Sequence, residues 1–524
     1  MNPENTNLIK TRKEAAVRLP FAIGCGSGLI VLRYTKSKNS AEAVQGCSRL
    51  GGGIYMEKIN AWTVYDEGQL AELEKLNAEY MDFLSRGKTE RECAKIAVGM
   101  AEAAGYRNLD DIIAKGESLK AGDKVYAVNM AKAVILFIVG TKPIEEGMNI
   151  LGAHIDSPRL DAKQNPLYEE SGFAYFDTHY YGGVKKYQWV ALPLAIHGVV
   201  AKKDGEVIDV VIGEDENDPV VSVTDLLPHL AADQMKKQAS TVIEGEKLDV
   251  LIGSRPLAES KTEGEKGKKE KEAVKAGILK LLKEKYDMDE EDFLSAELEI
   301  VPAGKARETG LDRSMIMSYG QDDRVCAFTS LRAILDVENV ERTACCILVD
   351  KEEIGSVGAT GMESKFFENT VAELLDRLGA YSGLALRRTL ANSKMLSSDV
   401  NAAYDPLYAE AYEKRNSSMA GCGMVFNKFT GARGKSGSND ANAEYIAKIR
   451  RIMDEAGVKF QLAELGKVDV GGGGTIAYIL ALYGMDVIDC GVAVLNMHAP
   501  WEITSKADVY ETKRGYEVFL RNMK

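Results

Sequence analysis

The chain has 524 residues, of which 45% are hydrophobic and 28% charged, a balance typical of globular proteins with a large core and more than one domain. Its 66 lysines and arginines against 79 aspartates and glutamates give a net charge of −13, which argues against partners such as nucleic acid or an anionic membrane surface. Eight cysteines occur without a Cys-x-x-Cys pair, which argues against zinc-thiolate sites and a disulfide framework and indicates reduced thiols in the cytoplasm.

The first residues of the chain differ in character from the rest. Basic residues precede a short apolar stretch over 19–32 that glycines interrupt. A signal peptide would have a cleaner apolar core and a small-residue cleavage site, and no run is long enough to span a bilayer. We expect a poorly ordered extension over 1–58, or translation that starts at Met56.

Helix and strand patterns follow in order. Apolar residues recur at helix spacing between Gly68 and Ala104, and the run AVILFIVG over 133–140 is typical of a strand covered on both faces. The stretch NILGAHIDSPR over 149–159 predicts a second buried strand that ends in a polar tip. From 160 to 304 short alternating segments predict an inserted β-rich unit, in which the charged run over 259–272 has no apolar face and suits a mobile, solvated loop.

After the insertion, helices and strands alternate again. We expect a helix from Val325, buried strands over 344–349 and 487–495, and a closing helix that Thr504 or Ser505 caps. This alternation predicts an α/β fold, a three-layer sandwich with a mostly parallel central sheet. The predicted domain limits are 59–159 and 305–524 for the sandwich and 160–304 for the insertion.

Polar side chains follow several predicted strands. His154 and Asp156 are two residues apart, so both leave the same face of an extended segment, where the imidazole can bind a metal and the carboxylate can hold a ligating ring in one tautomer. Alone this signal is weak, because a buried, hydrogen-bonded histidine is commoner. Further polar residues fall at strand ends, which meet at one edge of an open α/β sheet. They are Asp322, Glu353, Asp399 and His498.

Each of these acids alone has an ordinary explanation, as a helix cap or part of a solvated loop. Together they need compensation, because buried charges without partners are costly. Two divalent ions supply it, with one carboxylate bridging both and one histidine and one acid on each. Imidazole and carboxylate ligands together suit zinc, and manganese or cobalt stay open by ligand type.

The chain resembles the aspartyl aminopeptidase and aminopeptidase I family of dinuclear zinc peptidases. The resemblance runs in order from about Trp62 to the C-terminus and rests on six segments. They are LGAHIDSPRLDAK, GQDDR, VDKEEIGS, SSDVNAAYDP, GGGGTIAYILA and NMHAP.

The resemblance implies a role for each residue of the cluster. The implied metal ligands are His154 and Asp399 on one ion, Glu353 and His498 on the other, and Asp322 bridging both. Glu352 would be the general base, Asp156 would orient His154, and the Asp322–Asp323 peptide would be cis. The expected activity is that of a metalloaminopeptidase that releases N-terminal amino acids from short peptides by attack of a metal-bridging water.

The insertion shares the resemblance through DTHYYGGVKKYQW and LLPHLA. These segments resemble a dimerisation domain in which a histidine, here His229, reaches the active site of the neighbouring subunit. The resemblance implies a homododecamer, a tetrahedral shell of twelve subunits built from dimers that admits only short peptides.

One position departs from the family. Aspartate-selective members carry a lysine in the strand that here reads GMVFNKF, where Asn427 is the nearest match and Lys428 is one step along. One step in a strand moves a side chain to the other face, so a neutral preference is at least as consistent as an acidic one. Two other functions stay open: deacylation or carboxypeptidase cleavage at the same metal centre, and a non-catalytic shell protein.

Overall fold

The computed structural model describes residues 49–50, 53–54, 58–257 and 272–524. Most of the predicted extension over 1–58 and the charged run over 259–272 therefore lie outside the described residues. The chain divides into two compact units, Met1–Glu57 and Lys58–Lys524. In the first, β1 (Arg49–Leu50) and β2 (Gly53–Ile54) pair antiparallel; everything below concerns the second.

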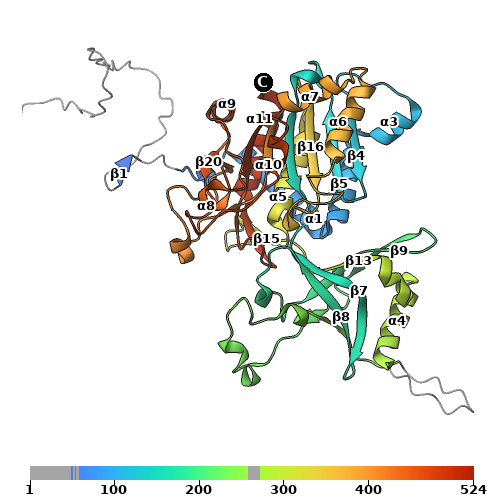
Figure 1. The fold of residues 1–524 in the computed structure, drawn as a ribbon. Coiled ribbons are helices and arrows are strands. Elements are labelled where there is room, and N and C mark those ends of the chain that lie inside the picture. Colours follow the sequence, from blue (N-terminus) through green and yellow to red (C-terminus); the bar gives the residue numbers. More distant parts are fainter. Residues whose placement is uncertain (1–48, 51–52, 55–57, 258–271) are drawn as a thin grey trace, which may run out of the picture. The chain divides into compact units, whose positions relative to one another are not determined.

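A nine-stranded sheet forms the centre of the second unit (Figure 1). Its four middle strands run parallel, and the sheet also contains three antiparallel pairs, β16–β5, β4–β5 and β19–β21. The predicted mostly parallel sheet is confirmed. In sheet order the strands are β20 (Phe460–Ala463), β19 (Met424–Asn427), β21 (Asp486–Gly491), β17 (Lys394–Ser398), β6 (Asn149–His154), β16 (Ala344–Val349), β5 (Ala133–Ile138), β4 (Lys124–Asn129) and β3 (Arg107–Asn108).

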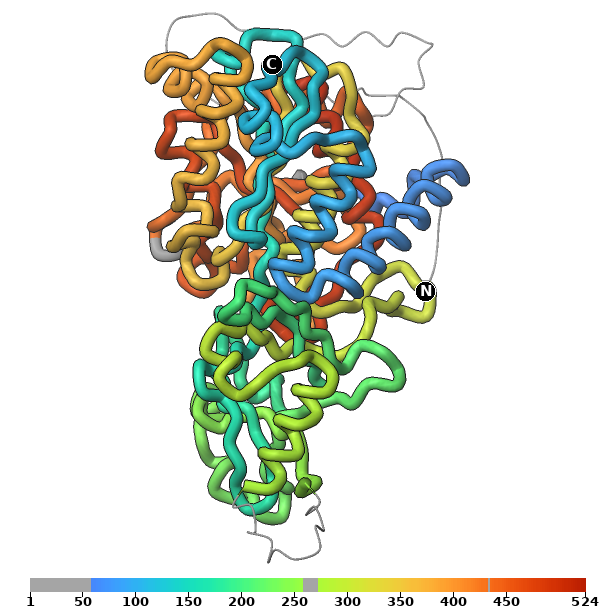
Figure 2. Tube along the Cα trace, turned by 90° about the vertical axis from the view of Figure 1, so that its right-hand side faces the viewer, coloured from blue at the N-terminus to red at the C-terminus, as the bar shows by residue number. Residues whose placement is uncertain are grey.

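Helices cover both faces of this sheet, because its strands are apolar on both sides. Leu136 belongs to one hydrophobic core and its neighbour Phe137 to the other, as the alternation of strand side chains requires. One core packs against α1 (Glu67–Arg86), α2 (Glu90–Ala103), α5 (Gln321–Asp336), α9 (Ala443–Glu455) and α11 (Lys506–Asn522). The other packs against α3 (Leu109–Lys115), α6 (Phe366–Arg377), α7 (Gly383–Asn392) and α10 (Ala477–Ala481). In Figure 2 the blue α1 and α2 lie across the sheet from the orange α6 and α7. The three-layer α/β sandwich is confirmed.

Local signals set the helix ends. The helical pattern predicted between Gly68 and Ala104 forms two helices, because Gly87 caps the end of α1 and Thr89 caps the start of α2 with a capping box to Glu92. Ser505 precedes α11, but its side chain makes no capping hydrogen bond. No helix among the described residues is long and apolar enough to cross a membrane.

The segment between β6 and α5 contains a seven-stranded antiparallel sheet with its own hydrophobic core, shown in green in Figure 1. The expected β-rich insertion is therefore present, with α4 (Ala273–Tyr286) packed on it. Its function in dimerisation stays a prediction. In sheet order the strands are β10 (Val207–Ile212), β9 (Leu194–Ala201), β13 (Ala296–Pro302), β7 (Arg159–Glu170), β8 (Phe173–Tyr181), β12 (Val250–Gly253) and β11 (Ser222–Val223).

A smaller five-stranded sheet brings distant parts of the chain to the carboxyl ends of the central strands. Its strand β15 leads directly into α5, and the turn between β22 and β23 contains His498. In sheet order the strands are β14 (Arg307–Thr309), β15 (Met315–Ser318), β23 (Glu502–Ser505), β22 (Ala493–Leu495) and β18 (Asn401–Ala402).

Candidate metal centre

The structure brings all five predicted metal ligands together. His154 ends β6, the helical turn η8 (Glu352–Ile354) follows β16, and Asp399 follows β17. Because these three strands are parallel neighbours, His154, Glu353 and Asp399 lie at the same edge of the sheet. Ligand atoms lie within 4.8 Å of one another in each of three overlapping groups. These are His154, Asp322 and Glu353; His154, Glu352 and Asp399; and Asp322, Asp323 and Asp399.

Asp322 lies at the centre of the cluster. Its Oδ1 is 3.3 Å from His154 Nε2 and its Oδ2 is 3.2 Å from His498 Nε2, so its two oxygens face two different histidines. His498 Nε2 is also 3.5 Å from Glu353 Oε2. The peptide between Asp322 and Asp323 is cis, as the resemblance implied.

Both histidines present the same ring nitrogen to the cluster. His154 Nδ1 is 3.1 Å from the carbonyl oxygen of Asp156 and 3.3 Å from its Oδ1. His498 Nδ1 donates to the carbonyl of Gly183 at 2.9 Å. Because these acceptors take the Nδ1 proton, each Nε2 is left with a lone pair for a metal.

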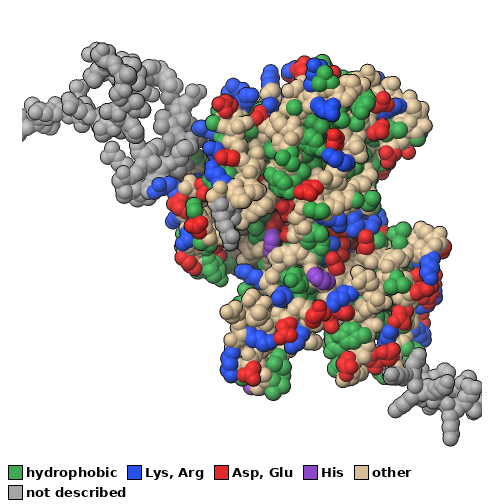
Figure 3. Space-filling view, in the orientation of Figure 1, with side chains coloured by type: hydrophobic (Ala, Val, Ile, Leu, Met, Phe, Trp, Pro, Cys, Tyr) green, Lys and Arg blue, Asp and Glu red, His purple; other side chains and the backbone are tan. Residues whose placement is uncertain are grey.

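Too many acids share this site for them to be charged without a cation. Burial raises the pKa of the Glu352 carboxyl to about 7 and that of Glu353 and Asp399 well above their usual range. Glu353 Oε1 is buried and has no hydrogen-bond partner among the described residues. Two imidazoles, several carboxylates and an orphaned buried oxygen are a donor set that fits divalent ions such as zinc. In Figure 3 acidic and histidine side chains gather in the hollow between the sandwich and the insertion.

Asp156 has wider contacts than the sequence suggested. It is fully buried and accepts from the Tyr181 hydroxyl at 2.8 Å. Its carboxylate also accepts from the backbone N–H groups of Glu352 and Glu353, each at 3.2 Å. One carboxylate therefore fixes the ring of His154 and the turn that contains both glutamates.

Sequence reasoning missed a buried acid beside the cluster, Glu502. Glu502 is buried and accepts from the backbone N–H of Asp322 at 3.0 Å and of His498 at 2.7 Å. Its only sequence signal is an acid at the start of a short strand. The N–H of His154 donates to Asp323 at 3.3 Å.

Two predicted functional positions lie apart from the cluster. His229 is exposed on η4 (Pro228–Leu230), and no described contact of the cluster involves it; its function in a neighbouring subunit stays a prediction. Asn427 is buried at the end of β19. In the amide orientation that satisfies both of its polar atoms, it accepts from Asn401 Nδ2 at 2.6 Å. Lys428 is exposed, with its amine 3.9 Å from Asp440.

Known proteins match this chain along most of its length. Residues 83–520 match the family described as aminopeptidase I zinc metalloprotease (M18). A probable M18 family aminopeptidase 1 from Clostridium acetobutylicum is 63% identical over 469 residues, which cover 90% of this chain and 99% of the relative.

Solved structures of the same family are similar to this chain in fold and sequence. The crystal structure of aminopeptidase I from Clostridium acetobutylicum has a TM-score of 0.82 and 60% identity, covering 89% of this chain and 99% of its own. That of an M18 family aminopeptidase from Thermotoga maritima has a TM-score of 0.83 and 44% identity, covering 89% and 100%. The chain therefore belongs to the aminopeptidase I zinc metalloprotease family and is an aminopeptidase.

Proposed function

We propose that this aminopeptidase releases N-terminal residues from short peptides with the help of two divalent ions, zinc in the first place and manganese or cobalt as alternatives. The observation that carries the proposal is the position of Asp322, whose two carboxylate oxygens face the Nε2 atoms of two histidines. In this arrangement His154 and Asp399 would hold one ion, Glu353 and His498 the other, and Asp322 both.

When bound, the ions supply a water of lowered pKa and an electrophile for the scissile carbonyl. Glu352 and Glu353 then have different functions. Glu353 faces the His498 ring at 3.5 Å, whereas the Glu352 carboxylate makes no hydrogen bond within the described residues. Glu352 would take a proton from the attacking water and pass it to the leaving amine. The Asp156 contacts to both backbone N–H groups would keep the two glutamates in these positions.

The preferred first residue of the substrate is neutral in our proposal. The buried position at the end of β19 is the neutral Asn427, and its partner Asn401 is two residues beyond Asp399. Lys428, the nearest cation in sequence, is exposed one residue past the end of β19. An acidic substrate side chain would therefore lack a buried cation from this strand.

We further propose a dodecamer built from dimers, located in the cytoplasm. A relative with 20% identity and a TM-score of 0.68 is the S. cerevesiae mApe1 dodecamer; at that distance the likeness shows the fold alone. Support from this chain is an apolar patch beside His229 on the insertion, which a second copy would cover. Its residues and exposed fractions are Leu226 (44%), Leu227 (49%), Leu230 (67%) and Met235 (75%).

The test is a panel of aminoacyl anilides, free and N-acetylated, combined with metal analysis and sedimentation of the purified full chain. We expect two metal ions per chain, turnover of neutral free-amino substrates and none of the acetylated ones. Turnover of acetylated substrates alone would replace this function with deacylation or carboxypeptidase cleavage. A chain that binds no metal and turns over none of them would be a non-catalytic shell protein.

A further inference from the structure

The inserted sheet touches the metal centre through three consecutive residues at the end of β8. These are Tyr181, Gly182 and Gly183, and each contacts a different residue of the cluster. Tyr181 is 8% exposed and donates its hydroxyl to Asp156, which in turn faces His154 Nδ1.

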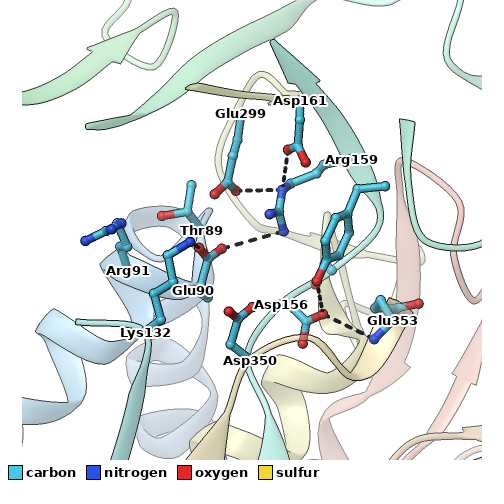
Figure 4. A network of polar contacts seen from close by, with 12 residues as sticks. Thr89, Glu90, Arg91, Lys132, Asp156, Arg159, Asp161, Glu299, Asp350 and Glu353 are labelled. Carbon is cyan, nitrogen blue, oxygen red and sulfur yellow. Dashed lines mark hydrogen bonds and ion pairs between the residues drawn. The ribbon is translucent and has the colours of Figure 1, made fainter. Parts of the chain in front are cut away.

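The position of Tyr181 is fixed from its other side. The guanidinium of Arg159, its direct partner on the neighbouring strand β7, lies 3.9 Å from the centre of the tyrosine ring. Arg159 is itself held by carboxylates from three elements, as Figure 4 shows. Its Nε is 2.8 Å from Asp161 and 3.1 Å from Glu299, and its terminal nitrogen is 3.6 Å from Glu90 on α2. A stacked, ion-paired guanidinium leaves the ring little freedom to turn.

The two glycines allow close approach to the other side of the cluster. Gly182 has a φ of +74°, and a Cβ there would lie 3.3 Å from Glu353 Cβ. A Cβ on Gly183 would lie 3.1 Å from His498 Nδ1, the atom that donates to the Gly183 carbonyl. Any larger side chain at 183 would therefore push the His498 ring away.

We propose that residues 181–183 of the inserted sheet position both histidine ligands, Tyr181 through Asp156 for His154 and the Gly183 carbonyl for His498. The insertion then sets the affinity of the centre for divalent ions, in addition to any function in assembly. This proposal rests on the metal centre of the proposed function. Tyr181 is a positioning residue, because it acts through Asp156 and touches neither metal nor substrate.

The first test compares Tyr181→Phe with Tyr168→Phe in the full-length chain. Both tyrosines belong to the inserted sheet, and each donates its hydroxyl to an aspartate. Tyr168 donates to Asp249 at 2.5 Å, so Tyr168→Phe is the matched control. Competition with a chromophoric chelator measures the zinc dissociation constants. We expect Tyr181→Phe to weaken the binding of one of the two zinc ions by about 10- to 100-fold, the usual effect of losing a hydrogen bond outside the metal ligands. Tyr168→Phe should leave both dissociation constants unchanged.

The unfolding temperature of the zinc-free chain separates positioning from a general structural effect. A structural effect would lower this temperature without a selective loss of zinc affinity. We expect the opposite pattern for Tyr181→Phe, because Phe keeps the ring on Arg159 and loses only the bond to Asp156.

The second test is Gly183→Ala, which should weaken zinc binding through His498 instead. Because both histidines face Asp322, the effects of the two variants on zinc binding should be coupled rather than additive in the double variant. If Gly183→Ala fails to fold, Tyr181→Phe decides alone. Wild-type zinc affinities in Tyr181→Phe would overturn the proposal. A wild-type chain that binds two zinc ions yet hydrolyses no peptide would instead overturn the proposed function and leave this inference intact.

Discussion

Glu352→Gln is the change that should separate catalysis from metal binding most cleanly. Glutamine keeps the size of glutamate, and the backbone N–H that donates to Asp156 at 3.2 Å is unaffected. The turn that contains Glu353 should therefore stay in place. What disappears is the only carboxylate of the cluster to which we assign proton transfer.

The size of the loss follows from that function. A positioned general base contributes about 10²- to 10⁴-fold to rate, or about 2.7–5.4 kcal/mol of transition-state stabilisation. Glu353 cannot replace it, because its carboxylate faces the His498 ring. We therefore expect kcat to fall by about 10³-fold or more, in the upper part of that range.

The assay is steady-state hydrolysis of a neutral aminoacyl anilide, with metal content measured on the same sample. Glu373→Gln, at an exposed position of α6, is the matched control and should keep wild-type kcat. Glu352→Gln with two bound ions and a kcat close to that of wild type would refute the assignment of the base. Loss of the ions together with activity would show that Glu352 is a ligand instead.

Three further changes test the centre and the fold. Asp322→Asn should reduce the bound zinc of the purified chain strongly, because it removes the charge shared between two histidines; near-stoichiometric zinc by elemental analysis would contradict the bridging function. Burial opposes protonation of His197, but Glu214 and Glu92 outweigh it and raise its pKa. Its stabilisation is therefore complete below the unfolded pKa of about 6.5 and lost as pH rises through the higher folded value, so urea unfolding of His197→Asn and wild type should differ most at low pH and converge at high pH. Phe328→Ala, at a position 1% exposed, should cost about 3–5 kcal/mol in the same assay; a loss below about 1 kcal/mol would contradict its place in the core.

The strands and the residues of the candidate metal centre could be predicted because their signals are local. Uninterrupted apolar runs marked β5 and β16, and polar residues at or shortly after strand ends marked His154, Glu353 and Asp399. The helical periodicity between Gly68 and Ala104 did not show where α1 ends and α2 begins, because the apolar pattern continues across the break. Gly87 after α1 and the capping residue Thr89 before α2 are signals of one residue each. A pattern of apolar residues averaged over many positions does not detect them.

The order of residues along the chain determined an α/β sandwich, an inserted β-rich unit and the residues of the candidate metal centre. Each of these follows from hydrophobic period or residue type, which a linear sequence contains. Only the tertiary structure decided what surrounds the ligands: Asp156 bound by Tyr181, His498 bound by the Gly183 carbonyl, and Glu502 on the backbone of both Asp322 and His498. Three of these four contacts join residues 25, 180 and 315 positions apart. They run through hydroxyl and backbone groups, and backbone groups leave no pattern in composition or spacing because almost every residue offers them.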